Sequence, residues 1–145
     1  CNIALKEGIA LTMGDGQDIT GGYSSFAAEM LSVNEIIKSA REGINLLALI
    51  DEPARTTNPI EGRALVQGML DTLSGYRISV IVSTHYNADE GNYKRLRVIG
   101  FVDGKMDYRL VEAKKGDVLH FFIKIAGTLG VDSEWLSATE KYLKD

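Results

Sequence analysis

Two adjacent carboxylates, Asp51 and Glu52, directly follow a short apolar segment and are the side chains best placed for chemistry. The segment before them, residues 46–50, is a continuous apolar run, typical of a strand buried on both faces of a parallel sheet. Open α/β sheets bind their ligands at the carboxyl ends of such strands. In a phosphate-transferring ATPase, the first acid holds Mg²⁺, directly or through water, and the second polarises the attacking water. The alternative is that both acids simply end the strand and cap the next segment.

His85 lies just beyond a second apolar run, residues 78–83, which we expect to form the neighbouring strand. Two strands joined through a helix by short links form a βαβ unit, so the strands are predicted to be parallel with a right-handed crossover. His85 and the acid pair then lie at one edge of the sheet, where the imidazole could reach a γ-phosphate. A histidine after a strand can equally be a hydrogen-bonded structural group.

The other expected elements follow from apolar periodicity and from turn residues. They are a strand at residues 9–13, helices at about 26–40 and 60–73, a β-hairpin at 95–111 around Asp103-Gly104, and helices at 118–129 and 133–143. The helix at 60–73 is predicted to present Ala64, Leu65, Met69, Leu70 and Leu73 to the sheet.

Two loops add candidate ligand-binding groups. Residues 20–25 offer hydroxyls and unhindered backbone N–H groups before a helix, which suits phosphate or sulfate binding. Helix capping by Ser24 or Ser25 explains the same residues. Arg55 follows the acids and either stabilises a charged phosphate or locks the loop through an ion pair; on the residues alone we favour the locking role.

Composition narrows the class of protein. The 145 residues are 45% hydrophobic and 25% charged, as in a soluble globular domain, and the net charge of −4 argues against a surface that coats nucleic acid. Cys1 is the single cysteine, so an internal disulfide is excluded and a reducing cytoplasm is expected. No apolar stretch approaches the roughly 18 residues of a membrane span. We therefore expect a cytoplasmic protein without a membrane partner.

Taken in order, these segments resemble the ATPase domain of the MutS family of DNA mismatch-repair proteins, which are ABC-type ATPases. Asp51-Glu52 is similar to the family's Walker B pair, and residues 84–86 (Thr-His-Tyr) resemble its switch-histidine motif. Residues 9–26 are similar to a family segment ending in Asp-Asp-x-x-x-Gly-x-Ser-Thr-Phe. The resemblance makes Gly22, Ser24 and Ser25 the signature loop, which in the family reaches the nucleotide of the opposing subunit.

The segment after the acids carries the resemblance further. Arg55, Thr57 and Gly62 fall on the family pattern Asp-Glu-x-x-Arg-Gly-Thr-x-x-x-Asp/Glu-Gly. The resemblance implies an α/β fold, namely a partial P-loop NTPase domain of ABC type with a mostly parallel sheet and flanking helices. It divides the chain into residues 1–115, the C-terminal part of the ATPase domain, and residues 116–145, a helical dimerisation extension.

The resemblance also implies a mechanism and partners. Asp51 positions Mg²⁺, Glu52 the attacking water and His85 the γ-phosphate of ATP, while Gln17 senses Mg²⁺ or water. Arg55 and Thr57 join the nucleotide-binding set. A homodimer is implied, because each signature loop completes the partner's ATP site, and the C-terminal helices add to the interface. Mismatched double-stranded DNA is bound by domains that in the family lie upstream.

Several departures mark a divergent branch of the family. Pro53-Ala54 replaces an Ile/Leu-Gly pair, Thr56 stands where the family has glycine, and Tyr23 replaces an arginine. A loop that needs glycine conformations should tolerate Thr56 poorly. The phosphate-binding motif Gly-x-x-x-x-Gly-Lys-Ser/Thr does not occur in the 145 residues. In the family it lies upstream of Ile9, so we expect these residues to belong to a longer protein and to be inactive alone.

Three functions compete at this point. The first is a mismatch-repair ATPase that couples its ATP state to DNA binding. The second is a MutS-like ATPase outside repair that remodels a protein partner, for example by reactivating a cobalamin-dependent aminomutase. The third is a dimerisation module that has lost turnover.

Overall fold

The computed structural model describes residues 5–13, 25–114, 117 and 121–142 of the chain. These residues belong to two compact units, Cys1–Tyr93 and Lys94–Asp145. The expected division at residue 115 stays a prediction. Within the described ranges, no helix combines the length and the apolar content that crossing a bilayer requires.

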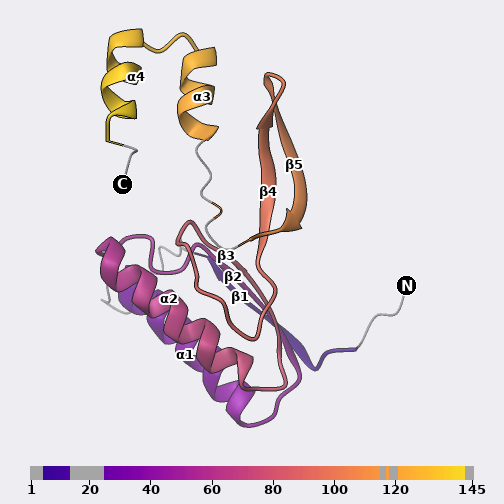
Figure 1. The fold of residues 1–145 in the computed structure, drawn as a ribbon. Coiled ribbons are helices and arrows are strands. Elements are labelled where there is room, and N and C mark those ends of the chain that lie inside the picture. Colours follow the sequence, from indigo (N-terminus) through magenta and orange to yellow (C-terminus); the bar gives the residue numbers. More distant parts are fainter. Residues whose placement is uncertain (1–4, 14–24, 115–116, 118–120, 143–145) are drawn as a thin grey trace. The chain divides into compact units, whose positions relative to one another are not determined.

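The first unit is built on a parallel sheet of three strands in the order β1-β2-β3 (Figure 1). The strands are β1 (Gly8–Met13), β2 (Leu46–Asp51) and β3 (Ser79–Ser83). Met13 pairs with Asp51, and Asp51 pairs with Ser83, so the carboxyl ends of the three strands lie level with one another. The predicted parallel strand–helix–strand unit is therefore confirmed, and its register brings the residues after β2 close to those after β3.

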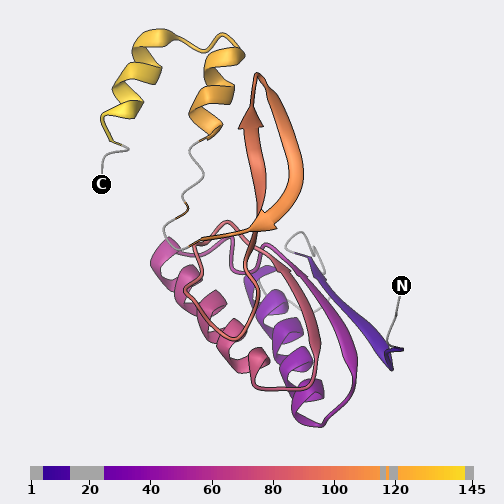
Figure 2. The same cartoon turned by 45° about the vertical axis from the view of Figure 1, so that its right-hand side comes forward.

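Two helices, α1 (Ser25–Arg41) and α2 (Pro59–Ser74), run side by side against one face of this sheet (Figures 1 and 2). The α1 helix is followed by Gly43, whose φ of 80° is a left-handed conformation that glycine adopts without a Cβ penalty. The α2 helix begins after Asn58, whose side chain accepts a hydrogen bond from the N–H of Ile60. Helix stop and start signals in the sequence therefore located both helices to within a few residues.

The core of the first unit lies between this helix pair and the sheet. Its buried apolar residues are Val33, Ile36 and Ala40 of α1, Ala48 and Ile50 of β2, Ala54, and Val66, Met69 and Leu73 of α2. The predicted inner face of α2 was partly wrong, because Val66 is 2% exposed whereas Leu65 is 41% exposed. The buried stripe of α2 consists of Gly62, Val66, Met69 and Leu73, a spacing of three to four residues that leaves Leu65 outside the buried face.

The opposite face of the sheet remains apolar and open among the described residues. Ile9 is 71% exposed and Ile81 64% exposed, and Leu47 and Leu49 of β2 are only half-buried. The expectation that β2 is buried on both faces is therefore wrong for the described part of the chain. The cause is topological: α1 and α2 both pack on the side that carries Ala48 and Ile50.

The second unit contains a β-hairpin and two short helices. The hairpin pairs β4 (Leu96–Val102) with β5 (Lys105–Glu112) in antiparallel register, with a bulge between Val98 and Gly100. Asp103 and Gly104 both have positive φ, 48° and 79°, as expected for the two-residue turn that the sequence predicted. The helices are α3 (Phe121–Thr128) and α4 (Ser133–Glu140), and the side chain of Asp132 caps α4.

Two glycines of α2 allow a matched stability test. A Cβ added at Gly68 would contact no atom within 4 Å, so Gly68→Ala should stabilise the first unit by about 0.5–1 kcal/mol through helix propensity. A Cβ added at Gly62 would lie 2.2 Å from the Tyr86 hydroxyl oxygen, so Gly62→Ala should destabilise it by about 1–3 kcal/mol. Urea unfolding midpoints measure both effects. Equal stabilisation by the two substitutions would contradict the close packing at Gly62.

A pH-dependent contact is expected in the second unit. The Asp117 carboxylate accepts hydrogen bonds from the backbone N–H of Lys114 at 2.9 Å and from Arg97 Nε at 2.8 Å, and these bonds lower the pKa of Asp117. Their contribution to stability is therefore present at neutral pH and lost as the pH falls through the lowered pKa. An NMR titration of the Asp117 carboxyl carbon should give a midpoint below the ordinary ~3.9. Arg97→Gln should raise that midpoint only partway, because the Lys114 bond remains.

Candidate active site

The residues that end β2 and β3 form a hydrogen-bonded cluster at the carboxyl edge of the sheet. Asp51, the last residue of β2, is exposed and accepts a hydrogen bond from the hydroxyl of Ser83, its register partner at the end of β3. The backbone N–H of Glu52 lies 3.1 Å from the Ser83 carbonyl oxygen and 3.2 Å from its hydroxyl oxygen, and donates to both. Ser83 therefore contacts both acids at once.

The second acid meets the predicted histidine. Glu52 Oε2 lies 2.5 Å from Nδ1 of His85, two residues beyond β3. The His85 side chain is 48% exposed and that of Glu52 32% exposed, so both can reach a ligand from solvent. The imidazole also lies against the ring of Tyr86, with ring centroids 4.1 Å apart. The structure thus places Asp51, Glu52 and His85, three of the residues for which the motifs predicted chemical roles, at one edge of the sheet.

The contact between Glu52 and His85 defines which ring nitrogen is available. A neutral histidine that donates to a carboxylate through Nδ1 carries its proton there, so Nε2 keeps a free lone pair. If the ring is protonated, Nε2–H becomes a donor suited to an anionic oxygen. The site therefore presents one carboxylate on Asp51, a second on Glu52 that is oriented by the imidazole, and one ring nitrogen with no part in that bond.

The other predicted site residues are spread over neighbouring segments. Thr57 and Arg55 lie in the turn after the acids; Thr57 N–H donates to the Ala54 carbonyl oxygen at 3.3 Å, and Arg55 is exposed. Ser25 is the first residue of α1 and is also exposed. Gln17, Gly22 and Ser24 lie outside the described residues. Their roles in nucleotide binding stay predictions.

The backbone strain in this turn lies elsewhere than expected. Thr56 is not among the described residues with positive φ, so position 56 does not need a glycine conformation in this structure. The left-handed conformations fall on Glu52, with φ of 47°, and on Ala54, with φ of 60°. Such conformations cost a non-glycine residue about 1–2 kcal/mol each, so other contacts must hold this turn.

Ser83 is a site residue that the sequence interpretation missed. It lies at the end of an apolar run, where a serine gives no signal of its own. Only the parallel register, which pairs Asp51 with Ser83, places its hydroxyl against both acids. The sequence alone does not specify this register, so it carries no signal that identifies Ser83.

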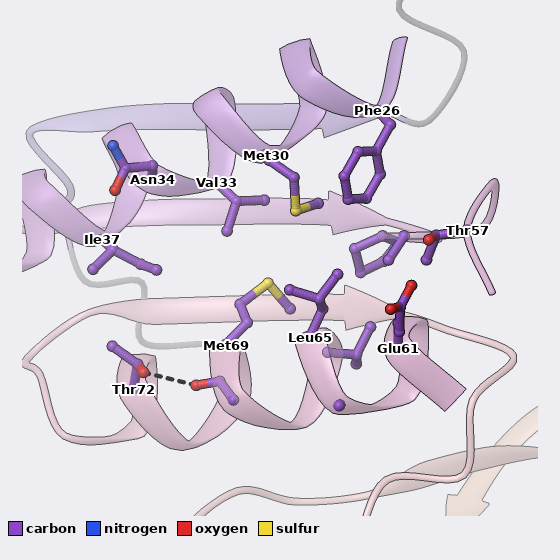
Figure 3. A pocket seen from close by; sticks show the side chains of 15 residues that line it. Phe26, Met30, Val33, Asn34, Ile37, Thr57, Glu61, Leu65, Met69 and Thr72 are labelled. Carbon is purple, nitrogen blue, oxygen red and sulfur yellow. Dashed lines mark hydrogen bonds between the residues drawn. The ribbon is translucent and has the colours of Figure 1, made fainter. Parts of the chain in front are cut away.

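A separate apolar groove of about 770 Å³ lies between α1 and α2. Met30 and Val33 of α1 face Leu65 and Met69 of α2 across it, with Phe26, Thr57 and Glu61 at one end (Figure 3). Neither acid of the pair nor His85 lines this groove. Its walls are mostly apolar and none of the residues of the acid–histidine cluster lines it, so the candidate site remains that cluster.

These observations define an α/β protein with two carboxylates and a histidine at the carboxyl edge of a parallel sheet. The family model described as MutS domain V matches residues 1–125. The chain belongs to the MutS family. The resemblance noted from the motifs is thereby confirmed.

Individual relatives agree with this assignment. The chain is similar to endonuclease MutS2 of Fusobacterium nucleatum, at 35% identity over 85 residues, covering 59% of this chain and 11% of that protein. It is also similar to endonuclease MutS2 of Caldanaerobacter subterraneus, at 28% identity over 150 residues, covering 97% and 18% respectively. DNA mismatch repair protein MutS of Thermus aquaticus is 35% identical over 85 residues, covering 59% and 10%. The chain therefore spans less than a fifth of the length of these relatives.

The hydrogen bond between Glu52 and His85 predicts a tautomer. In the neutral state His85 should carry its proton on Nδ1, and Glu52→Ala should remove that preference because the acceptor is gone. Histidine side-chain ¹⁵N NMR distinguishes the tautomers, and the signal of His120, the second histidine of the sequence, serves as an internal reference. An Nε2–H tautomer of His85 in the unsubstituted chain would contradict the contact.

Proposed function

We propose that this chain is part of the ATP-hydrolysing domain of a MutS-like DNA mismatch-repair protein, in which the state of the bound nucleotide controls binding to mismatched DNA. The observation that carries the proposal is the hydrogen-bonded pair of Glu52 and His85 beside Asp51, at the carboxyl edge of a parallel sheet. Membership of the MutS family supports it independently.

Asp51 is the residue proposed to hold Mg²⁺, directly or through water. Mg²⁺ binds oxygen ligands and is usually held by one or two carboxylates, water and substrate phosphates, and Asp51 is an exposed carboxylate at a strand end. Its neighbour Ser83 donates to one carboxylate oxygen and leaves the other available. When bound, the ion would neutralise charge on the β- and γ-phosphates. The donor chemistry of the site thus fits this ion.

Glu52 and His85 are proposed to act on water and phosphate. Glu52 is proposed to polarise the water that attacks the γ-phosphate, because its carboxylate is both accessible and held in one orientation by the imidazole. The remaining nitrogen of His85, Nε2, is directed to the γ-phosphate in the proposal. Arg55, Thr57 and Gln17 complete the nucleotide-binding set in the same subunit.

The proposed assembly is a homodimer with composite ATP sites. Gly22, Ser24 and Ser25 are assigned to the signature loop that completes the site of the partner. Phe122 of α3, Leu129 directly after α3 and Trp135 of α4 are exposed large apolar side chains that suit a subunit interface. Mismatched double-stranded DNA is proposed to be bound by other domains of the full-length protein.

The names of the relatives supply an alternative within the family. MutS2 relatives are named endonucleases, and the MutS relatives are named for mismatch repair, so a DNA-directed role outside mismatch recognition is the second candidate. The departures at Pro53-Ala54, Thr56 and Tyr23 are compatible with an ATPase that remodels a protein partner, or with a module that has lost turnover. A measurement of ATP hydrolysis distinguishes the module that has lost turnover, which should hydrolyse no ATP, from the other candidates, which should hydrolyse it.

The base assignment predicts a specific separation of binding from turnover. In the full-length protein, Glu52→Gln should lower kcat for ATP about 100-fold or more while leaving ATP affinity intact, because the amide cannot accept the proton. Steady-state phosphate release and equilibrium nucleotide binding measure the two quantities. Glu35→Gln, an exposed acid paired with Lys38 on α1, is the matched control and should change neither. Unchanged turnover in Glu52→Gln would refute the role of Glu52.

The DNA partner is tested by comparing turnover without DNA, with a perfect duplex and with a duplex that contains a single mismatch. A change in ATP turnover or nucleotide exchange that is specific to the mismatched duplex is the expected result. Turnover that does not respond to either duplex would favour the protein-remodelling alternative. A lack of hydrolysis in every condition would favour the dimerisation module.

A further inference from the structure

Ala54, two residues beyond Glu52, is held through both of its backbone polar groups by side chains from other segments. Its N–H donates to Glu29 Oε1 of α1 at 2.8 Å, in a buried bond. Its carbonyl oxygen accepts from the Tyr86 hydroxyl at 3.0 Å. Ala54 is fully buried and Glu29 is 8% exposed, so water offers little competition for these bonds. A buried glutamate that is bonded to a backbone amide is an uncommon use of a charged side chain.

These bonds act on the strained part of the turn. Glu52 and Ala54 both have left-handed φ values, and Pro53 between them is fully buried. At its start the turn is attached to Ser83, through the N–H of Glu52, and at its end it is attached to Glu29 and Tyr86. With both ends of the turn attached, the backbone position of Glu52 is defined, and from it the carboxylate reaches His85 Nδ1 at 2.5 Å.

Tyr86 connects the two halves of the site. It directly follows His85 in sequence and its ring lies against the imidazole, while its hydroxyl reaches across to the turn that carries Glu52. Gly62 of α2 gives the hydroxyl room, because a Cβ there would lie 2.2 Å from the Tyr86 oxygen and 3.2 Å from the Ala54 carbonyl oxygen. The tyrosine thus fixes the spacing between the acid and the histidine.

We propose that Glu29 and Tyr86 are positioning residues for the Glu52–His85 pair: they hold Glu52 and Ala54 in their left-handed conformations and so set the orientation of the proposed base. The inference deepens the proposed function and rests on it for its effect on turnover. Its effect on the geometry of the pair does not depend on ATP hydrolysis. Neither residue hydrogen-bonds to the Glu52 carboxylate or to the His85 ring: Glu29 acts through the backbone of the turn, and Tyr86 acts through the same turn and through the contact of its ring with the imidazole.

Tyr86→Phe isolates the bond, because it removes the hydroxyl and keeps the ring against His85. In the full-length protein, kcat for ATP should fall about threefold to tenfold with an unchanged KM, as expected when one neutral hydrogen bond is lost from a positioning contact. Tyr93→Phe is the matched control: the Tyr93 hydroxyl also donates to a backbone carbonyl, that of Asp89 at 2.7 Å, away from the acid pair. It should leave kcat unchanged. Equal effects of the two substitutions would overturn the inference.

Glu29 is tested by a pair of substitutions. Glu29→Gln keeps an oxygen that accepts the Ala54 N–H and should retain most of the turnover, whereas Glu29→Ala leaves a buried amide without its acceptor and should lower kcat at least as much as Tyr86→Phe. If kcat is retained in Glu29→Gln and lowered in Glu29→Ala, the side-chain oxygen that accepts the Ala54 N–H is the group responsible for the effect. Equal kcat in both variants would contradict the role of Glu29. If Glu29→Ala does not fold, the comparison of Tyr86→Phe with Tyr93→Phe still tests the inference.

A second measurement separates failure of this inference from failure of the proposed function. In the 145-residue chain, the ¹⁵N signals of His85 report its bond to Glu52 without any turnover. Tyr86→Phe should shift these signals toward those of Glu52→Ala, and Tyr93→Phe should leave them unchanged. If the wild-type full-length protein hydrolyses no ATP, the proposed function fails. The positioning role is then tested only by the His85 ¹⁵N signals of Tyr86→Phe and Tyr93→Phe. Unmoved His85 signals in Tyr86→Phe would then refute the positioning role.

Discussion

The geometry of the candidate site depends on the three-residue turn after β2. Its first and third residues, Glu52 and Ala54, are not glycines but adopt left-handed conformations, and the residue between them is a buried proline. Isolated peptides disfavour this arrangement, so it persists because the surrounding fold supplies compensating contacts. The fold provides them from three directions: the end of β3, the first turns of α1 and the segment that carries His85. Tertiary hydrogen bonds thus offset the conformational strain of Glu52 and Ala54 in the turn that carries the proposed base.

The sheet and the helices contribute differently to this site. Parallel register places Asp51 opposite Ser83 and makes the two strand ends coincide, which is a property of the backbone alone. The helices α1 and α2 then cover the face with Ala48 and Ile50, while Asp51, Glu52 and His85 at the carboxyl edge remain accessible to solvent. Glu29 shows how the two contributions meet, because its helix packs in the core while its carboxylate reaches the turn. The same packing that buries the apolar stripe of α1 therefore supports an exposed polar site.

Much of the first unit could be predicted from the sequence, because its strands are apolar runs and its helices have clear stop signals. The acid pair and His85 were found because a parallel βαβ unit brings the residues after its strands together. Ser83 and the hydrogen bonds of Glu29 could not be found, since they depend on register and on the direction of single side chains. The inner face of α2 was misjudged because the predicted face left out Val66, which stands at helical spacing from Met69 and Leu73 in the buried stripe, and included Leu65, which is largely exposed. Burial of β2 on both faces was expected from composition, but composition does not say which faces the described helices cover.

The contact between Gly62 and Tyr86 has a consequence for how such a sequence can diverge. A side chain at position 62 and a phenol at position 86 compete for the same space beside the Ala54 carbonyl. A larger residue at 62 therefore displaces the Tyr86 hydroxyl or favours a different residue at 86, and in either case the bond to the turn is weakened or lost. The two positions are 24 residues apart in the chain, yet they should change as a pair. Positions 62 and 86 together thus indicate whether a relative has kept this way of holding its acid or has found another.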